Sequence, residues 1–253
     1  MKVFTAVVLL FLALSFFSDA AFAQQGKTIP LPKIGIDVGT ADSPKDVSVT
    51  MQMLILLTVL SLAPSILIMT TSYLRLIVVF HFLKTALGTQ QMPPSQMLAG
   101  VALFITFFIM APTWTKVNDE AIKPYMDGKM TMEAAYDKGI EPIRQFMFRN
   151  VRDADLELFI GLSNMPRPKT RQDLPTYVLV PAFAISELRA GFIIGFFLFI
   201  PFLMVDMIVS SVLMSMGMMM LPPMLVSLPF KILLFILVDG WNLIIGSVVR
   251  SFG

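Results

Sequence analysis

Five charged side chains interrupt the last two apolar blocks of this chain, and their chemistry needs an explanation. A charged group at the centre of a bilayer costs ~2.5–3.5 kcal/mol on insertion scales, so each one requires a partner, water or a function. Two interpretations follow: the charges pair between helices or subunits and specify the packing, or they form a proton or ion relay. We favour packing. The five residues are Glu187, Arg189, Asp206, Lys231 and Asp239.

The spacing of these residues limits how they pair within one helix. Glu187 and Arg189 are two positions apart, so they point to different sides of a helix and do not satisfy each other. Asp206, Ser210 and Gly217 fall on one helical face, which indicates a packing surface more than a lipid-facing one. The pattern therefore predicts contacts between helices or between subunits at these positions.

A methionine-rich stretch with the sequence MSMGMMMLPP precedes the last apolar block. Methionine is unbranched, with three rotatable bonds and a polarizable sulfur, so it packs against irregular shapes. Met218, Met219 and Met220 adjoin Pro222 and Pro223, which we expect to break the helix and place the methionines in a turn. The methionines fill gaps in a helical bundle or, if a ring of subunits presents these turns inward, form an apolar collar that closes a pore.

Several classes of chemistry have no residues to support them. The chain has no cysteine and a single histidine, His81, which argues against thiolate sites, disulfides, histidine metal sites and a charge-relay triad. No glycine-rich phosphate loop, HExxH or GxSxG motif is present. The net charge of +2 is too small to suggest nucleic acid. We therefore expect no enzyme activity, no metal and no cofactor.

The composition places the chain in a membrane and predicts helices. Of its 253 residues 56% are hydrophobic and only 14% charged, with a mean hydropathy of +0.78. Spans are predicted at 51–74 and 95–112, with the connection carried by 75–94, so that 48–112 forms a first helical hairpin.

The third apolar block, 182–221, would measure ~60 Å as one helix, about twice the thickness of the hydrocarbon core. It is therefore too long for an upright span, and Pro201 is expected to bend it. Gly191-x-x-x-Gly195 offers a close approach to another helix. The region 182–253 is predicted to form a second hairpin with the methionine-rich turn at its tip.

The N-terminal 23 residues have the pattern of a cleaved signal peptide. An apolar run is followed by Ala21-Phe22-Ala23, an A-x-A cleavage pattern. The alternative is an uncleaved anchor, for which the run is short. Residues 24–47 hold three prolines and three glycines and are predicted to be a flexible arm outside the cytoplasm.

Residues 113–181 change character and are predicted to form a small helical domain outside the bilayer. Apolar residues recur there at helical spacing, while neighbouring arginines lie off the stripe on what we expect to be a solvated face. The stripe consists of Ile143, Phe146, Met147, Val151, Ala154 and Leu158, and the arginines are Arg144, Arg149 and Arg152.

Five long blocks of the chain carry a resemblance to a known family. They are TTSYLRLIVVFHFLKTALGTQQMPPSQMLAGVALFITFFIMAPTW (70–114), IRQFMFRNVRDADLELF (143–159) in the domain outside the bilayer, PAFAISELRAGFIIGF (181–196), IPFLMVDMIVSSVLMSMGMMMLPP (200–223) and SLPFKILLFILVDGWN (227–242). These blocks closely resemble the FliP family, the flagellar branch of the inner-membrane export-gate proteins of type III secretion. The likeness runs from about residue 50 to the C-terminus.

The resemblance implies a fold and a role that the composition cannot supply. It implies an all-α integral membrane protein of bent hairpins in the bacterial inner membrane, within the flagellar basal body, and assembled as a pentameric ring. The implied partners are FliQ and FliR in a cone-like core complex, FlhA and FlhB alongside, and unfolded flagellar proteins that cross the gate. It assigns Met218, Met219 and Met220 to a gasket around the pore.

Two alternatives remain at this stage. The injectisome counterparts resemble FliP over the same blocks but typically lack a cleaved signal and an N-terminal extension, so residues 1–47 favour the flagellar branch. A small-solute or proton-coupled transporter would use the buried acids, but the two halves of the chain show no internal repeat, which many transporters have.

Overall fold

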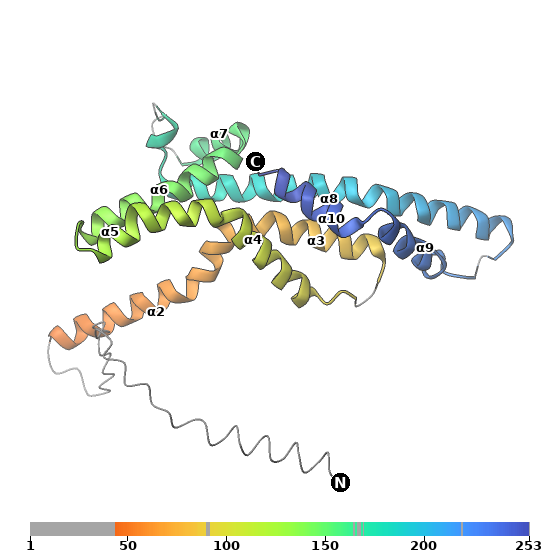
Figure 1. Ribbon diagram of the computed structural model, residues 1–253, viewed down its shortest axis with the longest axis horizontal. Helices are drawn as coiled ribbons and strands as arrows, with labels where there is room; N and C mark the ends of the chain where they lie inside the picture. The colour runs from red at the N-terminus through yellow and green to blue at the C-terminus, as the bar shows by residue number, and fades with distance from the viewer. Residues whose placement is uncertain are drawn as a thin grey trace, which may run out of the picture. The chain divides into compact units, whose positions relative to one another are not determined.

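The computed structural model describes residues 44–89, 92–163, 165, 168, 170–218 and 220–252. These residues form helices and connecting turns, without a strand among them (Figure 1). The expected signal peptide, residues 1–23, and most of the expected arm lie outside the described residues. The arm is shorter than predicted at its far end, because the first described helix already begins at Pro44.

Several helices are long and apolar enough to cross a membrane. Three qualify singly: Met51–Thr70, Ser95–Met126 and Thr176–Ser215. A fourth candidate is a bent pair, Pro223–Leu237 and Gly240–Arg250, whose halves meet at 63°. The prediction of an all-α membrane protein is therefore confirmed.

The first part of the chain contains three helices: α2 (Pro44–Thr70), α3 (Tyr73–Leu87) and α4 (Ser95–Val117). The expected connection across 75–94 is wrong over most of its length, because α3 occupies the part up to Leu87. The true turn begins at Gly88, whose φ of 70° places it in the left-handed region that glycine adopts without strain.

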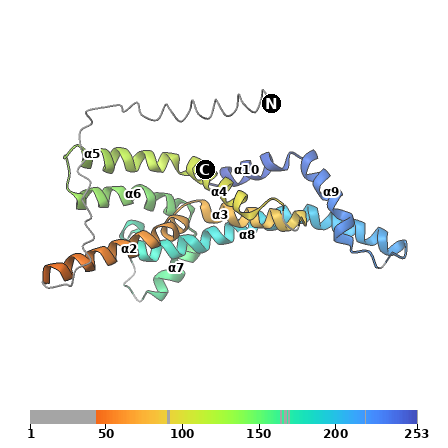
Figure 2. The same cartoon turned by 90° about the horizontal axis from the view of Figure 1, so that it is seen from below.

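Helix α3 packs along α8 (Thr176–Ser215), and this seam organises the fold (Figure 2). Gly191 and Gly195 lie in the seam. A Cβ at Gly191 would come within 3.0 Å of the Val78 side chain, and one at Gly195 within 2.5 Å of Phe82. The close helix approach predicted from this glycine pair is confirmed.

Two clusters of buried apolar side chains form the cores of this arrangement. The first core, around the seam, is centred on fully buried side chains of α3: Leu76, Val79, Phe80 and Leu83. The second core joins α4 and the start of α8 to α6 (Met132–Asn150) and α7 (Asp153–Leu162). Its most buried members are Met110, Met147, Leu179, Ala182 and Phe183.

The region after α4 is helical, as predicted, but its boundaries differ from the sequence pattern. Helix α4 continues through one π-helical turn, η1 (Asn118–Ile122), into α5 (Lys123–Met126), and α6 (Met132–Asn150) packs back against it. Helix α7 (Asp153–Leu162) then packs on α8.

The prediction of one continuous apolar stripe across this region is wrong for the residues after Val151. Val151 has an extended backbone, with φ −80° and ψ 142°, so the helical phase is lost between α6 and α7. Ala154 and Leu158 consequently face outward, and Leu156 is buried in their place.

The second hairpin begins with a short 3-10 turn, η2 (Arg171–Asp173), before α8. Helix α8 runs through Pro181 and Pro201 without interruption for 40 residues, so it is about 60 Å long, as the sequence predicted for an over-long block. It is followed by α9 (Pro223–Leu237) and α10 (Gly240–Arg250).

Candidate functional site

A buried ion pair joins α3 to α8. The Arg75 guanidinium donates from Nη2 to Glu187 Oε1 at 2.5 Å and from Nε to Glu187 Oε2 at 3.0 Å. The two side chains are 5% and 0% exposed. This paired, two-point geometry is the one in which arginine and carboxylate bind most strongly, and it supplies the partner that a charge inside an apolar block requires.

A second ion pair joins α8 to α9. Lys231 Nζ lies 2.7 Å from Asp206 Oδ2, and the Ser227 hydroxyl donates to the other carboxylate oxygen, Oδ1, at 2.5 Å. Ser227 and Lys231 are four residues apart and therefore lie on the same face of α9. Two groups from α9 thus bind the Asp206 carboxylate, and they join the two helices of the hairpin at this point.

Arg189 and Asp239 are placed differently from the other predicted charges. Both are exposed, and neither forms an ion pair within the described residues. Asp239 has a φ of 49° and sits at the start of α10, where its carbonyl accepts from the backbone N–H of Leu243. A role for the five charges between subunits stays a prediction.

The methionine-rich turn forms the tip of the α8–α9 hairpin. Met218 is 45% exposed and Met220 98%, whereas Met219 lies outside the described residues. The tip has no charged residue between Asp206 and Lys231. It therefore presents large, flexible, apolar side chains outward from a hairpin that the ion pair holds together.

The expected role of the two prolines requires a correction. Helix α8 ends at Ser215, before either proline, and Gly217 follows in the left-handed region with a φ of 74°. Pro222 is the N-cap of α9, and Pro223 is its first residue. Proline suits the first helical position because that N–H has no partner within the helix. The prolines therefore start α9 rather than end α8.

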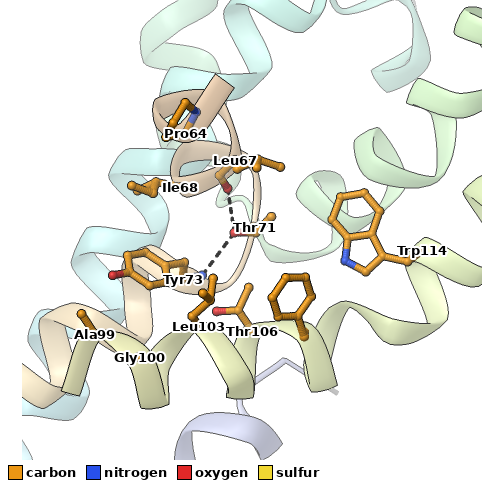
Figure 3. Close-up of a pocket in the computed structure, with 11 residues that line it drawn as sticks. Pro64, Leu67, Ile68, Thr71, Tyr73, Ala99, Gly100, Leu103, Thr106 and Trp114 are labelled. Carbon is orange, nitrogen blue, oxygen red and sulfur yellow. Dashed lines mark hydrogen bonds between the residues drawn. The ribbon is translucent and has the colours of Figure 1, made fainter. Parts of the chain in front are cut away.

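An apolar cavity of about 400 Å³ lies between α2, α3 and α4 (Figure 3). No charged residue lines it. Its threonine hydroxyls are already satisfied: Thr71 donates to the Leu67 carbonyl at 2.7 Å, and Thr106 donates to the Ala102 carbonyl at 2.8 Å. The other side-chain polar groups of the lining residues are the Tyr73 hydroxyl and the Trp114 indole N–H, and no charged side chain accompanies them.

Comparison with known proteins shows the family of this chain. A sequence model of the FliP family matches residues 56–248, which is most of the chain. The chain belongs to the FliP family. It is a membrane protein of the flagellar export apparatus.

Three members of the family are similar over 83% to 98% of their own length. The flagellar biosynthetic protein FliP of Bacillus subtilis is 54% identical over 217 residues, which cover 86% of this chain and 98% of that protein. The FliP of Caulobacter vibrioides is 49% identical over 245 residues, covering 97% and 89%. That of Treponema pallidum is 47% identical over 224 residues, covering 88% and 83%. All three have flagellar names, which favours the flagellar branch over the injectisome.

Sequence reasoning missed two buried arginines in this FliP-family chain. Arg75 lies at the start of the stretch 75–94 that is expected to carry the connection between the first two spans, although it is the partner of Glu187. Arg144 was placed on a solvated face, but it is buried and donates to Thr176 Oγ1 at 2.7 Å and to the Leu174 carbonyl at 2.7 Å. The one available signal for Arg75 is its position at the end of the uncharged stretch 47–74. Arg144 carries no such signal.

Proposed function

We propose that this protein is a pore-forming subunit of the flagellar protein-export gate and that unfolded flagellar proteins cross the inner membrane through it. The proposal assigns it no catalytic step. Membership of the FliP family and the membrane-spanning helices support a place in the export apparatus. The observation that carries the finer proposal is the exposed methionine tip of the α8–α9 hairpin.

The tip has the properties that a seal requires. Its exposed side chains include Met214, Met216, Met218 and Met220, and they reach beyond the Asp206–Lys231 ion pair into a region without charge. Several subunits presenting this tip to a common axis would create an apolar constriction, which excludes ions by dewetting. Because methionine changes conformation easily, the same side chains can reshape around a passing chain.

The proposal extends to the surroundings of this gate, and the resemblance to the FliP family supports it there. The protein forms a homo-oligomeric, pentameric ring with FliQ and FliR, and FlhA and FlhB act beside it. The signal peptide, residues 1–23, is removed, so the mature N-terminus lies outside the cytoplasm. Glu187, Arg189, Asp206, Lys231 and Asp239 hold helices and subunits in register.

The test is a strain that lacks the gene and carries either the wild-type protein or the triple variant Met218→Ala, Met219→Ala and Met220→Ala. Hook and filament proteins in the culture supernatant report export, and ion conductance of the membrane reports sealing. We expect the wild type to restore export. The triple variant assembles, because the hairpin below the tip is untouched, but it leaks ions or exports poorly.

A control removes two methionines that are also strongly exposed but lie far from the tip in sequence. Met126→Ala with Met132→Ala changes side chains that are 76% and 75% exposed at the α5–α6 turn, and we expect neither readout to move. Unchanged conductance and export in the triple variant would rule out the methionine seal. Normal flagellar export in the deletion strain would rule out the gate itself.

A further inference from the structure

The turn that follows α10 reaches back to the buried ion pair of α3 and α8. Arg75 Nη1, the nitrogen that Glu187 leaves free, donates to the Ser251 carbonyl at 2.9 Å and to Ser251 Oγ at 2.7 Å. The guanidinium carbon lies 3.7 Å from the centre of the Phe252 ring. Ser251 and Phe252 therefore complete the surroundings of the Arg75 charge, by hydrogen bonds and by a cation–π contact.

Phe252 also connects the two cores. It packs against the first core around the α3–α8 seam and against the second core around α6 and the start of α8. Its ring stacks on that of Phe146 with the centroids 6.0 Å apart and the planes at 20°. Among the described residues, Ile109 of α4 is the other side chain that packs against both cores without belonging to either.

The buried face of helix α10 continues into Phe252. Val248 lies four residues before Phe252 and is fully buried, and Ile244 is buried one turn earlier. The Ser251 hydroxyl donates to the Val248 carbonyl at 2.6 Å while it accepts from Arg75. Loss of the contacts at 251 and 252 would leave Arg75 Nη1 without two acceptors and would remove the anchor at the end of α10.

We propose that Ser251 and Phe252 form a latch that closes α10 over the Arg75–Glu187 pair. Opening this latch releases α10 while the α3–α8 seam stays closed, because the seam retains the two-point Arg75–Glu187 contact and the glycine approach. The latch is thus a local opening step built into the fold, separate from the methionine tip. The proposal does not depend on the export function.

The absence of natural cysteines allows a direct test on the full-length protein purified in detergent. Val248→Cys places a thiol at a fully buried position of α10, and Val79→Cys places one in the fully buried centre of α3. The rate of reaction with N-ethylmaleimide, followed by mass, reports the opening of each site. In otherwise wild-type protein we expect both thiols to be protected.

Adding Phe252→Ala removes the contact of the ring with Arg75 and its stacking on Phe146. Losing these contacts should shift the local opening equilibrium of α10, and so raise the labelling rate of the Val248→Cys thiol, by ~10-fold or more. The Val79→Cys thiol should stay protected. Phe252→Tyr keeps the ring and should keep protection. Ile109→Ala removes the other bridge between the cores without touching Arg75, so it should leave the α10 thiol protected.

Two results would overturn the latch. In the first, Phe252→Ala leaves the Val248→Cys labelling rate unchanged, which would mean that α10 is held by its other contacts alone. In the second, Phe252→Ala raises labelling at both reporter positions equally, which would mean that Phe252 supports the whole fold and that no local opening exists.

Discussion

Helices α2 and α3 follow each other in the chain, have similar apolar composition and end up in opposite surroundings. In the part of α2 that could span a membrane, Met51–Thr70, the one residue buried within the described chain is the last, Thr70. On α3, four successive core positions, Leu76, Val79, Phe80 and Leu83, are fully buried. Apolar composition predicts that a helix leaves water, but it does not say whether lipid, another protein or the chain itself covers it.

What distinguishes the two helices is the presence of specific partners. Helix α3 carries Arg75, which binds Glu187, and it lies against Gly191 and Gly195, where α8 has no side chains to keep it away. Helix α2 has no charged residue after Asp46. A seam between helices in this protein therefore depends on one buried charge pair and two small residues, and general hydrophobicity adds little to its specificity.

The largest effect on the difference between α2 and α3 is expected from removing the buried charge of Arg75 in α3. Arg75→Ala leaves Glu187 buried without a partner, so we expect a loss of about 3–5 kcal/mol in the free energy of unfolding. Thermal unfolding in detergent measures it. The double variant Arg75→Leu with Glu187→Leu should recover much of the loss, because no charge is then buried alone. A melting curve for Arg75→Ala that matches the wild type would contradict this account of the seam.

A matched pair of leucine substitutions sharpens the comparison directly. Leu83→Ala in α3 opens a cavity in the first core and should destabilise the purified protein by about 2–5 kcal/mol. Leu60→Ala in α2 changes a side chain that is 66% exposed, so its effect should stay within about 0.5 kcal/mol. Equal losses for the two would mean that α2 is packed as tightly as α3.

A smaller effect is expected at the second ion pair. Ser227→Ala removes the hydroxyl that donates to Asp206, while Lys231 remains in place, so we expect a loss of about 1.5 kcal/mol. Ser211→Ala is the control, because among the described residues that exposed hydroxyl donates only to the Met207 carbonyl of its own helix. Chemical denaturation of both variants measures the difference. Similar midpoints would mean that the Ser227 hydroxyl does not stabilise the α8–α9 hairpin.

The sequence was most informative where a property depends on near neighbours. The helical class and the great length of α8 follow from runs of apolar residues, and the glycine approach follows from a four-residue spacing on one face. It was least informative where a helix changes phase. The stripe through Val151 looked continuous because the extended backbone that breaks it leaves no mark in the order of apolar residues.

Local sequence was enough to establish that this chain leaves water as a set of helices, because helix formation and transfer into a membrane depend on side chains within a few turns of one another. Only the folded chain decided which charge meets which. Arg75 and Glu187 are 112 residues apart, and the hydrogen bonds from Arg75 to Ser251 span 176 residues. Such partners are selected by the packing of α3 against α8, since a buried charge is stable only where the whole fold brings its counter-charge and its acceptors within reach.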